Sequence, residues 1–279
     1  MLQDPAHKAV EEDLVSALKS GPALFVQPHY DDIPLSCGGT VALMAARGDE
    51  PHMVTVFAGE LVDEMVGEFA AWKHERWKVT DAEHVLSVRR TEDAEAAQAL
   101  GSAVRWLGLP DAIYRGVRYR SDPELFGVLK GEELELAAHL AEEICQLPEW
   151  RDGTRVFVPL GVGSHVDHQL VFEAGRHLAS RNVEVYAYED CPYAIHTPAG
   201  VEARLSVLCD AVGEPLVVPI GDRLEDRLRS IACYQSQVPV IFRFTTDFRS
   251  AVAEFAYKTG GKLGPAERFW PVRPRGDKA

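Results

Sequence analysis

Short apolar runs alternate with longer amphipathic stretches along most of this chain. Compact, mostly apolar runs predict buried strands at residues 23–27, 53–57, 104–107, 155–159 and 183–187. Between them, apolar residues spaced three and four apart predict helices at residues 39–47, 84–100, 131–147 and 168–180. Strands that are apolar throughout are typical of a parallel sheet covered by helices on both faces. We therefore predict an α/β fold, a Rossmann-like three-layer sandwich with a mostly parallel sheet.

The C-terminal part of the chain adds elements of a different kind. Residues 216–219 predict a further strand at the edge of the sheet, where Pro219 is tolerated, and residues 222–234 predict a helix after it. Residues 265–279, which are rich in proline and arginine, are expected to form a tail. The prediction is a single domain over residues 1–279, with a core at about 20–260 and a small C-terminal extension at the sheet edge.

Residues 60–83 form a long connection between the second strand and the next predicted helix. The segment carries Phe69, Trp72, His74 and Trp77. We favour an amphipathic helix that packs its aromatic side chains on the body of the protein. A lid over a substrate is the alternative, because long connections in compact domains are often functional.

Composition and charge exclude several classes of protein. The 279 residues are 46% hydrophobic and carry a formal net charge of −14, so a nucleic-acid partner or an anionic membrane surface is not expected. No apolar run is long enough to span a bilayer, and the first residues do not form a secretory signal. The five cysteines are scattered and form no CxxC pair, which indicates a reducing, cytoplasmic setting rather than a disulfide framework.

A first cluster of ionisable residues follows the first predicted strand. His29, Asp31 and Asp32 lie within four positions. Imidazole nitrogen and carboxylate oxygen both bind zinc, and a second carboxylate beside the ligands could accept a proton from water. Two adjacent aspartates repel each other unless a cation or hydrogen-bond donors lie between them. The alternative is an aspartate pair that caps the next helix, and at this stage it is equally favoured.

A second cluster follows the fourth predicted strand and contains His165, Asp167 and His168. Taken alone, it could be a polar loop with a helix cap at Ser164 or Asp167. The carboxyl ends of parallel strands share one edge of the sheet, where ligands bind in open α/β folds. The two clusters can therefore converge, and together they offer the His, Asp and His ligands of an open catalytic zinc site. We favour this joint metal site over coincidence.

With these motifs the chain resembles the PIG-L/LmbE-like N-deacetylases. That family typically has A-H-P-D-D-E followed by a glycine pair, and later H-P-D-H. The matching segments here are residues 28–33, 37–39 and 165–168, and weaker similarities occur at residues 89–92, 100–101, 107–111 and 229–237. The resemblance runs in family order from about residue 23 to residue 237.

The resemblance implies a role for each matching residue. The metal ligands would be His29, Asp32 and His168, holding Zn²⁺ or another divalent metal such as Fe²⁺. Asp31 would be the general base, His165 would assist the oxyanion or the leaving amine, and Asp167 would orient His165. Substrate contacts would come from Arg89 and Asp111, and Tyr193 is a further candidate because it follows the fifth strand.

The chain departs from the family pattern at two positions of the first motif. Tyr30 stands where the family has proline, and Ile33 stands where it has glutamate. The second change implies that a carboxylate behind the metal ligands is missing. The tyrosine that some relatives carry before the second motif is also absent, so a phenol near the oxyanion would come from Tyr30, Tyr193 or elsewhere.

The function implied by the resemblance is hydrolysis of an N-acetyl or other N-acyl group from an amino sugar or glycoconjugate. An amidase that cleaves a larger acyl group or a thiol-conjugate amide is an alternative. A metal-free module that binds a sugar or nucleotide is another, although the intact clusters argue against it. A dehydrogenase is disfavoured because no G-x-G-x-x-G follows the first strand. The expected partner is a small or intermediate amino-sugar substrate, and the sequence is compatible with a homo-oligomer.

Overall fold

The computed structural model describes residue 18 and residues 20–60, 66–77, 82–116, 118–197 and 199–275. The start of the chain, on which the signal-peptide expectation rests, lies outside these residues, and so does the side chain of Trp77. In the described part of the chain, no helix combines the length and apolar character needed to cross a bilayer.

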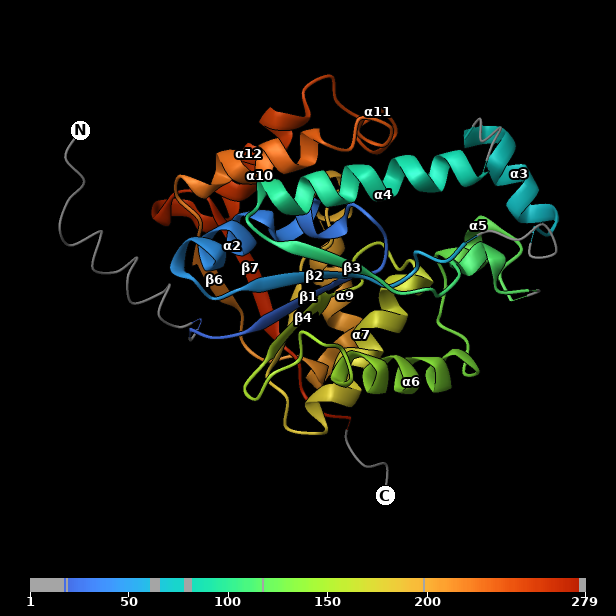
Figure 1. The fold of residues 1–279 in the computed structure, drawn as a ribbon, viewed down its shortest axis with the longest axis horizontal. Coiled ribbons are helices and arrows are strands. Elements are labelled where there is room, and N and C mark those ends of the chain that lie inside the picture. Colours follow the sequence, from blue (N-terminus) through green and yellow to red (C-terminus); the bar gives the residue numbers. More distant parts are fainter. Residues whose placement is uncertain are drawn as a thin grey trace.

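A single sheet of seven strands forms the centre of the protein (Figure 1). The strands are β1 (Ala23–Gln27), β2 (Pro51–Thr55), β3 (Ala103–Trp106), β4 (Arg155–Pro159), β5 (Val185–Tyr188), β6 (Leu216–Pro219) and β7 (Ala266–Pro271). Their order is β3-β2-β1-β4-β5-β7-β6, and the first five are parallel. The predicted α/β fold with a mostly parallel sheet is confirmed.

Helices cover both faces of the sheet. They are α2 (Asp32–Arg47), α3 (Glu68–Trp77), α4 (Ala82–Ala99), α5 (Asp122–Leu125), α6 (Glu133–Cys145), α7 (Val166–Ala179), α8 (Tyr193–His196), α9 (Gly200–Leu208), α10 (Arg223–Ala232), α11 (Val238–Ile241) and α12 (Phe248–Gly260). In Figure 1, α2, α4 and α10 lie above the sheet and α6 and α7 lie below it. Three layers result, as the sequence predicts.

Strand β1 shows why the strands are apolar on both faces. Leu24 and Val26 belong to the hydrophobic cluster on the side of α6 and α7, whereas Phe25 belongs to the cluster on the side of α2. Phe25 stacks on Phe157 of β4, with ring centroids 4.3 Å apart. Alternate residues of a strand point to opposite faces, so a strand buried on both sides needs apolar residues throughout.

The tail expected at residues 265–279 is wrong for residues 266–271, and residues 276–279 lie outside the described part of the chain. Residues 266–271 form β7, which inserts antiparallel between β5 and β6. Glu267 of this strand is buried and accepts hydrogen bonds from the backbone N–H groups of Gly39 and Thr40. Its charge is balanced by Arg227, 3.2 Å away. Glu267 of β7 caps part of α2. Because of such polar residues, β7 lacks the continuous apolar pattern of a strand that is buried on both faces.

The helix expected at residues 39–47 begins seven residues earlier, at Asp32. The helix has a kink at Cys37, where φ is −145° and ψ is 25°. Glu267 caps the part after the kink, and Pro34 is tolerated because it lies in the first turn. This early start places Asp32 in the first turn of α2, next to the loop from β1.

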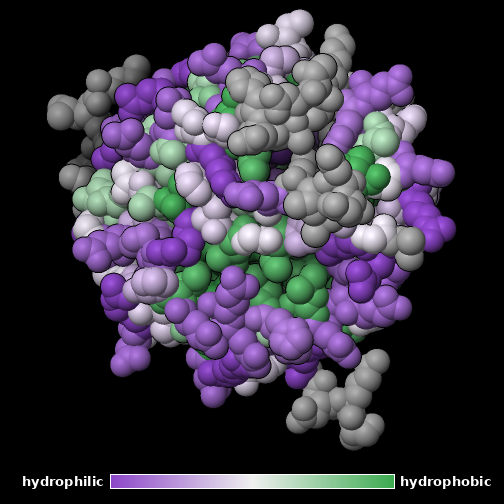
Figure 2. All heavy atoms as spheres, turned by 45° about the vertical axis from the view of Figure 1, so that its right-hand side comes forward, coloured by the Kyte–Doolittle hydropathy of each residue, from purple (hydrophilic) through white to green (hydrophobic). Residues whose placement is uncertain are grey.

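The segment that carries Phe69 and Trp72 contains a helix, α3, as favoured from the sequence. Phe69 packs beside a small hydrophobic cluster that includes Ile113, and Trp72 stacks on Phe69 but stays 41% exposed. The structure therefore confirms the helix and shows that only part of its aromatic surface is buried. On this side of the protein, Figure 2 shows hydrophobic side chains gathered in a central hollow surrounded by hydrophilic ones.

Candidate active site

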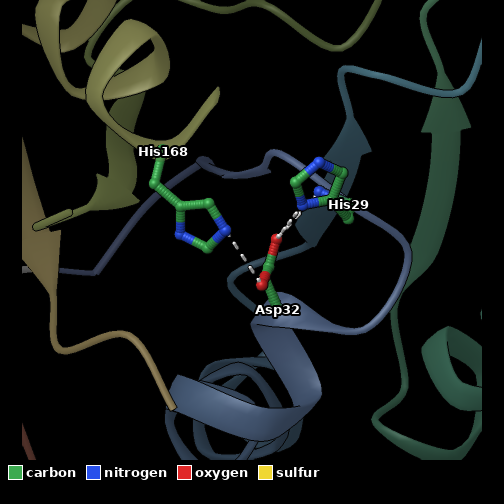
Figure 3. A group of neighbouring side chains, drawn as sticks. All are labelled: His29, Asp32 and His168. Carbon is green, nitrogen blue, oxygen red and sulfur yellow. Dashed lines mark hydrogen bonds and ion pairs between the residues drawn. The ribbon is translucent and has the colours of Figure 1, made fainter. Parts of the chain in front are cut away.

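The two His/Asp clusters meet at the carboxyl ends of β1 and β4. These strands are neighbours, and chain order reverses direction between them in the sheet. Such a switch point is where open α/β sheets bind ligands, because the connections leave to opposite faces and open a crevice. His29 lies in the loop after β1, Asp32 begins α2, and His168 lies in the first turn of α7 (Figure 3).

His29, Asp32 and His168 form a group that can hold a metal ion. One ligand atom from each lies within 4.8 Å of the others. Asp32 stands between the two rings, with Oδ2 3.6 Å from His29 Nδ1 and Oδ1 3.6 Å from His168 Nε2 (Figure 3). The His29 backbone N–H donates to Asp32 Oδ2 at 2.8 Å and so fixes the carboxylate. The group predicted from the sequence is thus assembled in space.

Each histidine of this group binds a carboxylate through its other nitrogen. His168 Nδ1 lies 2.6 Å from Asp190 Oδ1, and His29 Nε2 lies 3.1 Å from Asp167 and 3.3 Å from Asp111. Metal-binding histidines usually donate their second ring N–H to a carboxylate, which fixes the tautomer and strengthens the ligand. This pattern is an observation of the protein's own side chains that fits a divalent metal.

Burial and charge set the protonation of this group. Burial lowers the pKa of His29, but hydrogen bonds with Asp111 and Asp167 outweigh it and raise the pKa well above its ordinary value. Burial also lowers the pKa of His168, and Asp32 and Asp190 raise it above the ordinary value. Without a cation, positive charge on the imidazoles compensates the aspartates. A metal ion would supply the same charge, because clustered carboxylates need a cation between them.

A second group, His29, His165 and Asp167, also has ligand atoms close enough for a metal. The carboxylate of Asp167 is already occupied, however. Its Oδ1 accepts from Arg115 Nη1 at 2.6 Å, and its Oδ2 accepts from the Ala112 N–H at 3.1 Å. We therefore favour the group around Asp32, whose carboxylate is held by a single backbone N–H and faces two ring nitrogens.

Asp31 lies beside the metal group and does not cap the helix with its side chain. It occupies the N-cap position of α2 without a side-chain capping hydrogen bond. Its Oδ2 instead lies 3.5 Å from Arg89 Nη2, and the guanidinium of Arg89 lies over the ring of Tyr30. The capping alternative is therefore not realised, and the two neighbouring aspartates have different partners.

His165 is the N-cap residue of α7 and has its own environment. Its Nδ1 accepts a hydrogen bond from the Asp167 N–H at 3.2 Å, so in the neutral ring the proton is on Nε2. Burial lowers the pKa of His165 to about 3. The Asp167 carboxylate lies 4.0 Å from this ring and hydrogen-bonds His29 and Arg115 instead. That Asp167 orients His165, as predicted from the sequence, therefore stays a prediction.

Sequence analysis missed two residues at this site. Asp190 lies two residues after β5, near Tyr193, and no motif in the sequence marks it as a partner of His168. Arg115 lies 2.6 Å from both Glu133 and Asp167. The sequence does not reveal these ion pairs, because both partners lie far from Arg115 along the chain. Burial raises the pKa of Asp167, but Arg115 and His29 outweigh it and hold that pKa well below its usual range.

The remaining predicted residues also lie at this edge. Tyr193 packs edge-on against His168, with ring centroids 6.0 Å apart, and Asp111 contacts His29. Ile33, which replaces the family's glutamate, is buried in the hydrophobic core. The glutamate carboxylate of the family pattern is absent at this position, and Asp167 and Asp190 each place a different carboxylate behind one of the two histidines.

Comparison with known proteins finds relatives over most of the chain. A family model described as PIG-L: GlcNAc-PI de-N-acetylase matches residues 24–179. The 2'-N-acetylparomamine deacetylase of Niallia circulans is 29% identical over 266 residues, covering 88% of this chain and 89% of that protein. The enzyme of the same name from Streptomyces fradiae is 32% identical over 244 residues, covering 84% of this chain and 81% of its own.

Solved structures show the same similarity. A crystal structure of a deacetylase–bog complex from the biosynthesis pathway of teicoplanin has a TM-score of 0.78 and 25% identity, and covers 92% of this chain and 100% of that chain. The zinc-inhibited form of teicoplanin deacetylase has a TM-score of 0.76 at the same identity and coverage.

Proposed function

The chain belongs to the PIG-L (GlcNAc-PI de-N-acetylase) family, and from this premise we propose that it hydrolyses the N-acetyl amide of an amino sugar or glycoconjugate with a bound divalent metal. One observation carries the proposal. One ring nitrogen of His29 and one of His168 face Asp32, and the other nitrogen of each ring contacts a second carboxylate. The curated relatives are named deacetylases, and such enzymes hydrolyse N-acetyl amide bonds.

His29, Asp32 and His168 would hold the metal, for which we propose zinc, with Fe²⁺ as the alternative. Two imidazoles and a carboxylate are a donor set that zinc accepts, and three protein ligands leave a position open. A divalent metal bound there acidifies water and polarises the amide carbonyl. The protein must then supply a proton acceptor, a donor to the oxyanion and an oriented substrate.

Asp31 is the proposed proton acceptor. It is buried beside the ligands, and within the described part of the chain Arg89 is its one ion-pair partner. As water adds to the carbonyl carbon, one water proton moves to Asp31. When the C–N bond breaks, the same proton moves to the departing nitrogen, so that acetate and amine form. A positioned base of this kind typically contributes about 10²–10⁴ in rate.

His165 and Tyr193 are the proposed partners of the oxyanion. With its pKa lowered to about 3, His165 is neutral near neutral pH and can donate from Nε2. The lowered pKa also supports the assignment of proton return to Asp31 rather than to His165. Burial raises the pKa of the Tyr193 phenol, which therefore stays protonated and can donate a hydrogen bond.

We further propose that the chain acts as one domain on a small or intermediate amino-sugar substrate, with Arg89 and Asp111 contacting it. Both side chains are partly exposed at the edge of the metal group, with 24% and 27% of their surfaces accessible. The cysteines form no disulfide among the described residues, which supports a reducing compartment, for which we propose the cytoplasm.

The test is acetate release by the metal-loaded protein from a panel that includes 2'-N-acetylparomamine and N-acetylglucosamine. Chelation should abolish release, and zinc should restore it. Asp31→Asn should lower kcat by about 10² or more, whereas Asp152→Asn, an equal change of charge at an exposed turn, should not. If the metal-loaded protein releases acetate from no member of the panel, or if Asp31→Asn is as active as the parent, the proposal is wrong.

A further inference from the structure

A row of aromatic rings leads from the candidate active site to the surface. We call Phe126, Tyr193, His196 and Phe244 the aromatic ladder. Phe126 packs edge-on against His165, with ring centroids 5.2 Å apart. Ring centroids of successive pairs lie 6.4 Å apart for Phe126 and Tyr193, 5.9 Å for Tyr193 and His196, and 5.3 Å for His196 and Phe244. The rings are edge-to-face at each step, which is a favourable arrangement for aromatic pairs.

Three separate parts of the chain contribute to the ladder. Phe126 follows α5, Tyr193 and His196 belong to α8, and Phe244 follows α11. The two phenylalanines are 39% and 43% exposed, and His196 is exposed as well. Burying a phenyl ring against a ligand is favourable because it removes apolar surface from water. Two exposed phenyl rings in one row therefore leave apolar surface available to a ligand.

The ladder is held in place at Tyr193 and at Phe244. A Cβ atom on Gly163 would lie 2.6 Å from the ring of Tyr193, so the loop that leads to His165 packs directly on that ring. Gly163 has a φ of +84°, which favours glycine as well. At the outer end, Phe244 packs on buried Phe242, at 5.7 Å. The exposed rings are therefore positioned before a ligand arrives.

We propose that the aromatic ladder is a subsite for a flat apolar ring in the part of the substrate beyond the amide that is hydrolysed. This inference rests on the proposed deacetylase function. Because an acetyl group has a single carbon beyond its carbonyl, it cannot extend along four successive rings. For an N-acetylated amino sugar, the occupant is the aglycone, and an aryl aglycone offers the face that these rings accept.

The test compares the 4-nitrophenyl and methyl glycosides of N-acetylglucosamine, with the methyl glycoside of N-benzoylglucosamine as a third substrate. Affinity for the two amine products, 4-nitrophenyl and methyl glucosaminide, is measured by calorimetry on the same metal-loaded proteins. Each aromatic contact is worth about 2- to 10-fold. We expect kcat/KM and product affinity to favour the aryl glycoside by about 10-fold.

Phe244→Ala should reduce both aryl preferences by about 3-fold or more, and Phe244→Trp should retain them. Tyr257→Ala is the matched control, because Tyr257 is an aromatic residue on α12 that is 54% exposed and outside the ladder. It should leave both preferences unchanged.

The outcomes separate this inference from the function on which it rests. Acetate release with equal kcat/KM and equal product affinity for the aryl and methyl compounds would overturn the subsite and leave the deacetylase standing. A gain for the N-benzoyl substrate alone would overturn the aglycone assignment. Aryl-selective product binding that Phe244→Ala removes, without acetate release from either N-acetyl glycoside or from any member of the panel of N-acetylated sugars above, would support the subsite and refute the proposed deacetylase function.

Discussion

Asp190→Asn tests whether the carboxylate behind His168 is needed to bind a metal. In the parent protein, Asp190 Oδ1 lies 2.6 Å from His168 Nδ1, and Oδ2 accepts from the N–H groups of Gly161 and Val162 at 2.8 and 2.9 Å. An asparagine can keep both backbone hydrogen bonds through its oxygen. Its NH₂ group then faces His168 Nδ1 and makes that nitrogen an acceptor.

The substitution should therefore change the tautomer of His168. With Nδ1 accepting, the ring proton moves to Nε2, the nitrogen that faces Asp32 in the metal group. A protonated nitrogen cannot bind a metal. Metal binding then requires either the less favourable tautomer of His168 or a flip of the new side-chain amide at position 190, and both cost free energy. Loss of such a carboxylate typically costs 10- to 100-fold in metal affinity, or about 1.4–2.7 kcal/mol.

The assay is a competition titration with a chelating dye, which gives the Kd of zinc for each variant. Asp190→Asn should raise the Kd by about 10- to 100-fold and lower Tm only slightly, because the backbone hydrogen bonds remain. Asp152→Asn removes a charge from an exposed turn and should leave the Kd unchanged. A Kd for Asp190→Asn within threefold of the parent (about 0.7 kcal/mol) would refute the tautomer argument.

Three further predictions concern the other carboxylates and the substrate. Asp31→Asn should retain zinc by elemental analysis while kcat falls by about 10² or more, whereas Asp32→Asn should lose zinc and regain some activity in excess metal; the reverse pattern would mean that their roles are exchanged. Arg89→Ala and Asp111→Ala should each lower kcat/KM by about 10-fold or more, and unchanged KM and kcat would contradict their substrate contacts. Burial raises the pKa of Asp93 to about 6, although hydrogen bonds from four side chains lower it. The folded protein therefore holds this proton more tightly than the unfolded chain, and the stability so gained, on the order of 3 kcal/mol, is lost as pH rises through about 6. Urea unfolding should show this slope between pH 4 and 7 in the parent and not in Asp93→Asn.

Local sequence pattern was sufficient for the parallel part of the sheet. The predicted strands at residues 23–27 and 155–159 coincide with β1 and β4, and the others shift by one or two residues. A strand buried on both faces must be apolar at every position, so its signal lies within a few consecutive residues. The same holds for the two His/Asp clusters, because each lies in one short loop.

The C-terminal strand and the early start of α2 could not be predicted in this way. Glu267 is an inward-facing residue of β7, and its charge is compensated by Arg227 and by the backbone of α2. From the sequence, such a residue indicates solvent exposure. Its burial depends on partners that lie 40 or more residues away along the chain, and local pattern carries no information about them.

The sequence by itself determined which residues could hold a metal, since His29, Asp32 and His168 lie in recognisable motifs at strand ends. The tertiary structure alone decided that β1 and β4 are neighbours, which brings those motifs within 4.8 Å. It also decided that Asp190 and Arg115 complete the site. Both act through contacts between distant segments, and strand order in a sheet is set by the packing of the whole chain rather than by any one segment.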